Sequence, residues 1–142
     1  MNILVSACLL GIACRYDGKS KPNEQVMALT KKHRLIPFCP EIYGGLATPR
    51  PPAERQGEKV INKAGEDVTA QYQQGAREAL AMARLFHCQA ALLKEKSPSC
   101  GKGMIYDGSF QQKLIPGNGV TAELLLSEGI LILGESDIQT LL

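Results

Sequence analysis

Three short apolar segments of this chain each run directly into a turn that carries a cysteine. The cysteines are Cys8, after residues 2–7, Cys39, after residues 35–38, and Cys100, in the turn after residues 90–94. Short apolar runs with β-branched residues and Gly or Pro at their ends are typical of buried strands. Parallel sheets build their sites at the carboxyl ends of their strands, where distant loops converge. The sequence therefore predicts that the three thiols meet at one edge of a sheet.

Strand patterns and helix patterns alternate along the chain. The expected strands are residues 2–7, 35–38, 90–94 and 129–133. The expected helices are 22–32, opened by Pro22, a long helix that ends near His87 with Asp67 as its cap, and 122–127 with Thr121 as its cap. The long helix presents one apolar face, made by Val68, Tyr72, Ala76, Ala79, Leu80, Ala83 and Phe86. This order predicts an α/β fold, a single three-layer Rossmann-like domain spanning residues 1–142, with a mostly parallel sheet.

Three segments do not follow the alternation. Residues 40–52 are rich in proline and contain two adjacent glycines, so we expect an irregular functional loop that is neither helix nor central strand. Residues 58–62 are expected to form a strand of a small hairpin. Residues 104–115 alternate around an Asp-Gly turn and are expected to form a second hairpin excursion from the sheet.

Charge and cysteine content restrict the partners and the compartment. The 16 Lys and Arg residues against 14 Asp and Glu residues leave a net charge of +2, too little to indicate a nucleic-acid partner. No apolar run approaches the roughly 18 residues that predict a membrane span. Five cysteines without a regular disulfide spacing, and no secretory leader, indicate reduced thiols and a cytoplasmic location. The sequence leaves the oligomeric state open.

The cysteine spacing excludes the familiar metal ribbons. No Cys-x-x-Cys pair occurs, so a zinc finger or a ferredoxin-type run is ruled out. Three thiolates from three strands suit either an iron-sulfur cluster or a zinc ion, each with one coordination position left open. Cys14, six residues after Cys8, could act as a second ligand or a resolving thiol. Cys88, at a helix end, is expected to pack as a small apolar side chain.

Several polar residues accompany the cysteines. Glu41 follows Cys39 by two residues and could act as a general base or nucleophile beside a metal. Ser97 and Lys94, before Cys100, could orient a ligand or stabilise its negative charge. Ser99 is a further hydroxyl donor on the same turn. Three more residues are expected on the same rim: Arg15, Asp17 and Arg50.

Four motifs together resemble a known family. They are Val5-Ser6-Ala7-Cys8-Leu9-Leu10-Gly11 with Cys14-Arg15-Tyr16-Asp17-Gly18, Cys39-Pro40-Glu41-Ile42-Tyr43-Gly44-Gly45-Leu46 with Pro49-Arg50, Leu93-Lys94 with Ser97-Pro98-Ser99-Cys100-Gly101, and Gly119-Val120-Thr121-Ala122. This combination resembles the domain of unknown function 523 family, whose characterised branch is the bacterial 2-thiouracil desulfurases. The resemblance covers nearly the whole chain.

The resemblance implies a cofactor, a ligand set and a reaction. The cofactor is a [4Fe-4S] cluster held by Cys8, Cys39 and Cys100, whose fourth iron is free to take the sulfur of a thiocarbonyl. The substrate is a small thiolated pyrimidine, such as 2-thiouracil, or a related thioamide. Glu41 would activate water or attack directly as C=S becomes C=O, without net electron transfer. The role of Cys14 stays open.

Two other classes of function remain. The chain could be a non-catalytic iron-sulfur or zinc binding module, such as a sensor. It could also be a thiol-based redox enzyme that uses Cys8 and Cys14. The proline-rich loop with Glu41 favours the desulfurase, because neither alternative needs a carboxylate beside a ligand.

Overall fold

The structure is a computed structural model that describes residues 1–142, and its centre is a four-stranded parallel sheet. The strands lie in the order β2-β1-β5-β8. Their bounds are β1 Asn2–Ser6, β2 Arg34–Phe38, β5 Ala90–Leu93 and β8 Leu131–Gly134. All three neighbouring pairs are parallel, which confirms the predicted α/β sheet.

The position of each strand follows from its composition. The central strand β5 is entirely apolar and buried, and so are the three middle residues of β1, Ile3, Leu4 and Val5, as expected for strands covered on both faces. Strand β2 contains Pro37, which lacks a backbone N–H, and it lies at an edge where it pairs only with β1. The proline therefore limits β2 to the outside of the sheet.

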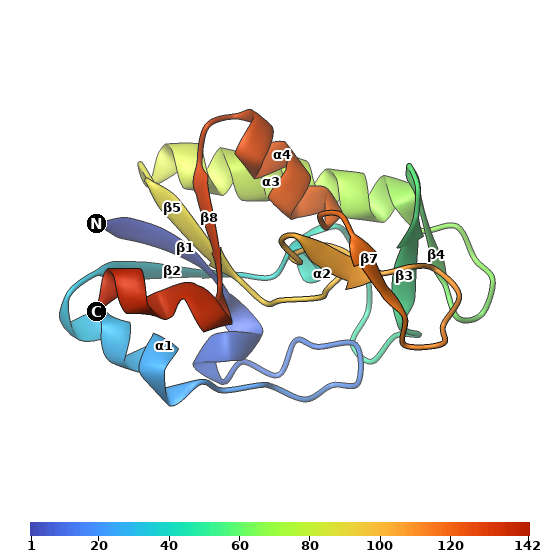
Figure 1. Ribbon diagram of the computed structural model, residues 1–142, viewed down its shortest axis with the longest axis horizontal. Helices are drawn as coiled ribbons and strands as arrows, with labels where there is room; N and C mark the ends of the chain where they lie inside the picture. The colour runs from blue at the N-terminus through green and yellow to red at the C-terminus, as the bar shows by residue number, and fades with distance from the viewer.

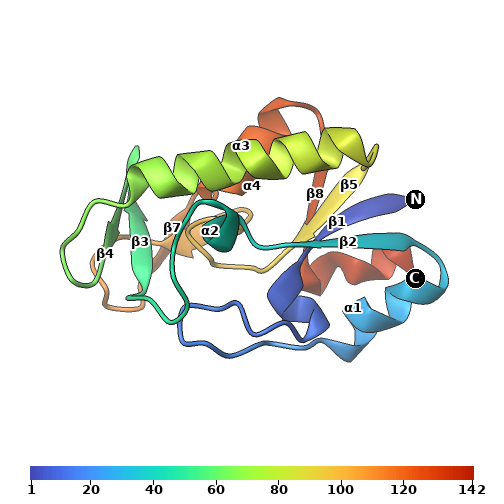
Figure 2. The ribbon, with the colours of Figure 1, turned by 180° about the vertical axis from the view of Figure 1, so that it is seen from behind.

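Helices cover both faces of the sheet (Figures 1 and 2). One face packs against α3 Thr69–Leu85 and α4 Val120–Ser127. The other packs against α1 Glu24–Ala28 and the 3-10 segments η1 Ala7–Leu10, η2 Leu29–Lys31 and η3 Glu135–Leu141. Side chains of β1 alternate between the two cores, with Ile3 and Val5 in one and Leu4 in the other. The predicted three layers are confirmed, and none of the helices has the length and apolar character needed to cross a membrane.

Two antiparallel hairpins lie at the end of the molecule opposite the N-terminus (Figures 1 and 2). The first joins β3 Ala53–Gln56 to β4 Lys59–Asn62, and the second joins β6 Met104–Tyr106 to β7 Leu114–Pro116. The second is the hairpin predicted over residues 104–115. The first contains the predicted strand at 58–62, whereas its partner β3 was not predicted, because its sequence Ala-Glu-Arg-Gln shows no strand-forming composition.

The prediction that residues 40–52 contain no helix was wrong. A short helix, α2 Pro40–Tyr43, begins directly after Cys39. Pro40 occupies the first helical position, where a missing N–H removes no hydrogen bond and the fixed φ favours the helix. The residues from Gly45 to Pro52 are irregular, as expected.

Three predicted helix starts need correction. Helix α1 is capped by Asn23, whose Oδ1 accepts the N–H groups of Gln25 at 3.0 Å and Val26 at 3.1 Å, so it does not start at Pro22. Helix α4 starts at Val120, and the predicted cap Thr121 is fully buried inside it. Helix α3 starts at Thr69 with Val68 at the cap position, one residue after the predicted cap Asp67.

The two ends of α3 show why its prediction was only partly right. Asp67 Oδ1 accepts the Thr69 N–H at 2.9 Å, so this carboxylate does satisfy an N-terminal donor although it lies just outside the helix. At the other end Phe86 follows the last helical residue and is 41% exposed, so it does not extend the buried face as predicted. The remaining members of that face are buried as expected.

Candidate metal centre

A cavity of about 580 Å³ opens where β1, β2 and β5 end. Four of the five cysteines line it: Cys8, Cys14, Cys39 and Cys100. Thus the three cysteines singled out in the sequence reach one cavity, together with a fourth. Cys88 does not line the cavity and is buried in the apolar core beneath α3, where it packs as a small apolar side chain.

Each of the three cysteines is placed by the end of a strand. Cys8 lies in η1, which begins directly after β1, and Cys39 is the residue that precedes α2 after β2. Cys100 lies in the turn that follows β5, where Gly101 N–H donates to Ser97 O at 2.9 Å. Cys8 and Cys100 are buried, and Cys39 is partly exposed to the cavity. The parallel sheet thus gathers thiols that are far apart in the sequence.

Cys14 occupies the space between two of these thiols. Hydrogen bonding with Cys39 lowers the pKa of Cys14, but hydrogen bonding with Cys8 and burial outweigh it, so the net pKa is raised. The Cys14 carbonyl oxygen also lies 3.8 Å from Cys39 Sγ. Cys14 is therefore part of the cavity wall, which sequence spacing alone left undecided.

The pKa values of Cys39 and Cys100 are raised as well. Hydrogen bonding with Cys14, followed by burial, raises the pKa of Cys39. Burial raises the pKa of Cys100 to about 12, although hydrogen bonds from the hydroxyls of Ser6 and Ser99 oppose this shift. Because thiolates are the species that bind metals, loading of this site releases protons.

Glu41 lies beside the thiols and is fixed through both carboxylate oxygens. Its Oε1 accepts a hydrogen bond from Arg50 Nε at 3.0 Å, and its Oε2 accepts one from Ser99 Oγ at 3.1 Å. The Arg50 side chain is 6% exposed and the Glu41 side chain 14% exposed, so this ion pair is shielded from solvent. Glu41 is thus a preorganised carboxylate at the cavity wall.

Arg50 is held by further bonds of its own. It donates through Nη2 to the Cys14 carbonyl at 2.8 Å, and through Nη1 to Ala47 O at 3.2 Å and Thr48 Oγ1 at 3.0 Å. The guanidinium therefore connects the irregular loop after α2 with the segment that carries Cys14. The sequence placed Arg50 at the rim but gave no sign of this bridging role, because the two segments are joined only by the fold.

Ser97 and Ser99 organise the turn around Cys100. Ser97 Oγ accepts the N–H groups of Ser99 and Cys100, both at 3.1 Å, and it lies 2.9 Å from Ser99 Oγ. Ser99 is almost fully buried and links this turn to Glu41, and its Oγ lies 3.5 Å from Cys100 Sγ. A continuous chain of hydrogen bonds therefore runs from Ser97 through Ser99 to Glu41.

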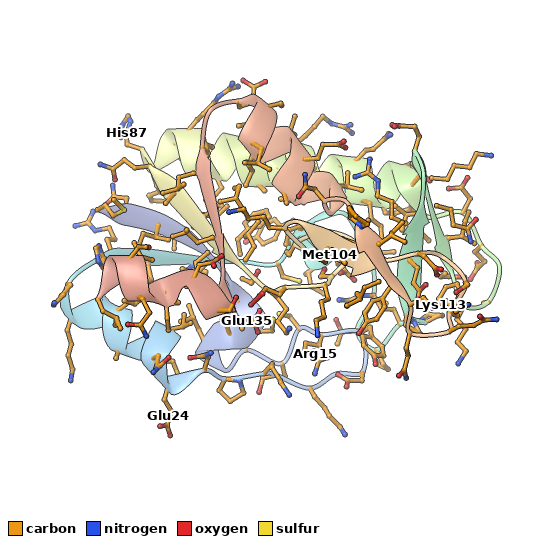
Figure 3. All side chains as sticks on the ribbon, in the orientation of Figure 1. Arg15, Glu24, His87, Met104, Lys113 and Glu135 are labelled. Atoms are coloured by element: carbon orange, nitrogen blue, oxygen red, sulfur yellow. The ribbon has the colours of Figure 1, made fainter.

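Lys94 lies at the same cavity but its charge is already paired. Its Nζ lies 3.1 Å from Glu135 Oε2 and donates to Glu95 O at 3.2 Å. Arg15 also lines the cavity, and Figure 3 shows Arg15 and Glu135 near the middle of the molecule. The predicted rim residue Asp17 does not line it and accepts the N–H of Lys19 at 3.0 Å instead.

Two residues of the site carried no clear signal in the sequence. Ser6, the last residue of β1, donates to Cys100 Sγ at 3.4 Å and accepts the Lys94 N–H at 2.9 Å. Tyr72 lines the cavity from α3, and burial raises the pKa of its hydroxyl, as do the charge of Glu41 and a hydrogen bond with it. Tyr72 lies on the apolar face of α3, where a core tyrosine would show the same pattern.

The arrangement of the donors bears on which metal group the cavity can hold. No three His, Cys, Asp or Glu side chains are arranged to hold a single metal ion. Zinc needs its sulfur ligands within about 2.3 Å of one ion, which forces them close together. A cluster binds each cysteine to a different iron, so its ligands stand further apart. Thiols that line one cavity but form no three-ligand site for a single ion are compatible with a cluster, whose cysteines bind different irons.

Comparisons with known proteins agree with this reading. The family model described as 2-thiouracil desulfurase matches residues 3–137. The uncharacterized protein YbbK of Bacillus subtilis is 43% identical, and the match covers 99% of each chain. A solved structure described as the [4Fe-4S]-dependent thiouracil desulfidase TudS is 48% identical with a TM-score of 0.93, covering 99% of this chain and 94% of that one. The chain belongs to the 2-thiouracil desulfurase family.

Proposed function

We propose that the protein is a desulfidase that converts the C=S group of 2-thiouracil, or a related small thiocarbonyl compound, into C=O. The observation that carries this proposal is a cavity in which four cysteines face a fixed carboxylate, Glu41. Membership of the 2-thiouracil desulfurase family and the match to TudS support it. Water supplies the oxygen and the sulfur leaves as sulfide, so no electrons are gained or lost.

The cofactor of this reaction is proposed to be a [4Fe-4S] cluster held by Cys8, Cys39 and Cys100. When bound, such a cluster supplies an open iron that acts as a soft Lewis acid toward the thiocarbonyl sulfur. The donor set fits, because each of these thiols lines the cavity and comes from a different strand end. Cys14 is then left to hydrogen-bond with two of the ligands.

Glu41 is proposed as the catalytic base or nucleophile. Arg50 and Ser99 hold its two oxygens, so the carboxylate needs no reorientation when a substrate arrives. A carboxylate held in this way can take a proton from the attacking water or attack the ring carbon itself. Ser97 positions Ser99, and Lys94 adds positive charge at the cavity despite its pairing with Glu135.

Reconstitution under anaerobic conditions tests this assignment. The wild-type protein is expected to bind about four iron atoms and to form uracil and sulfide from 2-thiouracil without a reductant. Alanine at any of the three proposed ligands should abolish both the brown absorbance and turnover. Cys88→Ala is the matched control, because Cys88 is buried away from the cavity, and it should retain both.

The Glu41→Ala variant separates the cofactor from the catalyst. It should keep the iron content and absorbance of the wild type and lose turnover by at least about a hundredfold. Normal turnover in this variant would show that Glu41 is not catalytic. A holoprotein that binds four iron atoms but never releases sulfide would instead indicate a non-catalytic binding module.

The contact between Cys8 and Cys14 supports one alternative function. Thiols that hydrogen-bond to one another could form a disulfide in a redox cycle. Such an enzyme would work without iron, resist chelators and show a titratable disulfide. Activity that requires iron, with both thiols free after turnover, excludes it.

The remaining features of the proposal follow from the same chemistry. We propose that residues 1–142 act as a single thiouracil-desulfurase-like domain on a free small molecule, with neither nucleic acid nor membrane as partner. Five free cysteines are compatible with a reducing compartment, so we propose a cytoplasmic location. An absence of turnover with free thiobase but turnover with thiolated RNA would contradict the choice of partner.

A further inference from the structure

The wall of the cavity that faces away from the sheet is made by the two hairpins. Ala53 and Glu54 of β3 line it, together with Tyr106, Phe110 and Gln112 of the β6–β7 hairpin. No cysteine belongs to this wall. Its residues therefore have no place in binding iron, and they are available to contact whatever else the cavity contains.

Glu54 joins the two hairpins through a single oxygen atom. Its Oε1 accepts the backbone N–H groups of Gly108 and Phe110, both at 3.0 Å. Gln56, two residues further along β3, donates from Nε2 to the Gly108 carbonyl at 2.9 Å. The Glu54 contacts are partly buried, whereas the Gln56 contact is exposed. Residues 107–113, the tip of the β6–β7 hairpin, are thus tied to β3 mainly by Glu54.

The hairpin tip adopts a conformation that its sequence does not favour. Phe110 has a φ of 58° and Gln112 a φ of 59°, both in the left-handed region that non-glycine residues rarely occupy. Both side chains line the cavity. Unfavourable backbone conformations persist only where surrounding contacts hold them, and they concentrate at binding sites. Here the Phe110 N–H is itself one of the two groups that Glu54 holds.

We propose that Glu54 is a positioning residue that holds Phe110 and Gln112 in place as the substrate-contacting wall of the cavity. This inference rests on the proposed desulfurase function. An aromatic ring and an amide suit a planar heterocycle that presents a flat face and N–H and C=O groups at its edge. Glu54 acts as a hydrogen-bond acceptor in this role, and its negative charge is not required.

The variants Glu54→Ala and Glu54→Gln distinguish positioning from direct participation. The amide oxygen of Gln can accept both N–H groups because both bonds go to one oxygen, whereas Ala accepts neither. In the reconstituted holoenzyme we expect Glu54→Ala to raise KM for 2-thiouracil at least about tenfold while kcat stays within about threefold. Glu54→Gln should restore KM to within about twofold of the wild type.

Proteolysis reports on the hairpin tip without using activity. Lys113 is exposed in this tip, and Figure 3 shows it at the hairpin end of the molecule, far from His87. We expect trypsin to cleave the holoprotein after Lys113 about tenfold faster in Glu54→Ala and at the wild-type rate in Glu54→Gln. Cleavage is located by mass spectrometry. Glu58→Ala is the control, because Glu58 is exposed on the same β3–β4 hairpin and does not line the cavity.

Each result decides a separate point. If Glu54→Gln is as impaired as Glu54→Ala, the charge acts on the reaction directly and the positioning role is wrong. If Glu54→Ala changes neither KM nor cleavage, Glu54 does not hold the tip. A wild-type holoprotein that does not desulfurate 2-thiouracil overturns the proposed function and the substrate contact. In that case the cleavage rates still decide whether Glu54 orders the hairpin.

Discussion

The cavity has two walls that are built in different ways. The thiol wall, which carries Cys8, Cys14, Cys39 and Cys100 together with Glu41, stands on the ends of buried parallel strands. The hairpin wall is formed by β3 and the tip of β6–β7. These belong to two separate two-stranded hairpins, which are not hydrogen-bonded to the central sheet. Isolated two-stranded hairpins are only marginally stable, so the second wall depends on side-chain ties such as that of Glu54.

This difference in construction matches a difference in the roles that we propose for the two walls. Groups that hold a cofactor or transfer a proton must be fixed to within a fraction of an ångström, which a buried sheet edge provides. Groups that admit and select a substrate can lie on elements that open locally, because such elements are drawn from the less stable parts of a fold. Changes to the residues that hold the thiol wall in place should therefore affect stability and chemistry together. Changes in the hairpin wall should affect substrate binding and the local order of the hairpin, and leave kcat nearly unchanged.

The largest effect is expected from Arg50→Met. This change removes the partner of a shielded carboxylate and breaks the bridge to Cys14, so it should lower the free energy of unfolding by about 3 kcal/mol and turnover at least a hundredfold. Urea denaturation and desulfuration assays measure both. The control Arg84→Met breaks an exposed ion pair with Glu128 and should cost about 0–1 kcal/mol. Equal losses in the two variants would show that the Glu41 site is not rigidly held.

The second largest effect is expected from Gly75→Ala in α3. A Cβ at this position would lie 2.0 Å from the Pro40 carbonyl oxygen, so α2, which begins next to Cys39 and carries Glu41, must move. Overpacking of this kind costs about 1–3 kcal/mol. We expect less bound iron and lower turnover after reconstitution. Glu78→Ala, an exposed change in the same helix, should do neither, and full iron content in Gly75→Ala would contradict the close packing of α2 on α3.

Ser6→Ala should have a moderate effect. It removes the hydroxyl that donates to Cys100 Sγ and accepts the Lys94 N–H, which should lower the free energy of unfolding by about 1 kcal/mol. The bound cluster should also be lost faster in air, as followed by the decay of its absorbance. Ser127→Ala, at an exposed position in α4, serves as the control. An unchanged decay rate would mean that Ser6 supports only the strand end.

The smallest effect is expected from Gln56→Ala in the hairpin wall. Only the exposed bond to the Gly108 carbonyl is lost, while both bonds of Glu54 remain. KM for 2-thiouracil should rise by about twofold, and the free energy of unfolding should change by no more than about 0.5 kcal/mol. Steady-state kinetics and urea denaturation test this. A fall in kcat at constant KM would contradict the assignment of substrate binding to the hairpin wall.

Sequence patterns predicted the sheet better than the loops. The four parallel strands were found because each contains a short apolar run bounded by turn residues, and burial on both faces imposes that composition on the central strands β1 and β5. Strand β3 was missed because its residues are mostly polar. Helix α2 was missed because proline normally disfavours helices, yet Pro40 stands at the one position where it favours them.

The residues of the candidate site also differ in whether the sequence could reveal them. Cys8, Cys39, Cys100 and Glu41 could be selected from the sequence, because chemically unusual residues stand in turns directly after strands. Ser6 and Tyr72 could not, since a serine at a strand end and a tyrosine on an apolar helix face look the same whether or not they line a cavity. The contact of Cys14 with two other thiols also needed the fold.

The sequence by itself therefore determined two things: the α/β order of the elements, and which thiols and which carboxylate lie at the strand ends. It could do so because periodicity and turn residues act over short stretches of chain. The tertiary structure alone decided that Arg50 bridges Glu41 and Cys14, that Ser99 connects Glu41 to the Cys100 turn, and that Glu54 ties one hairpin to another. These contacts join segments dozens of residues apart, or depend on how a turn is folded. Their hydrogen bonds form only after burial has brought the segments together, and no local pattern encodes them.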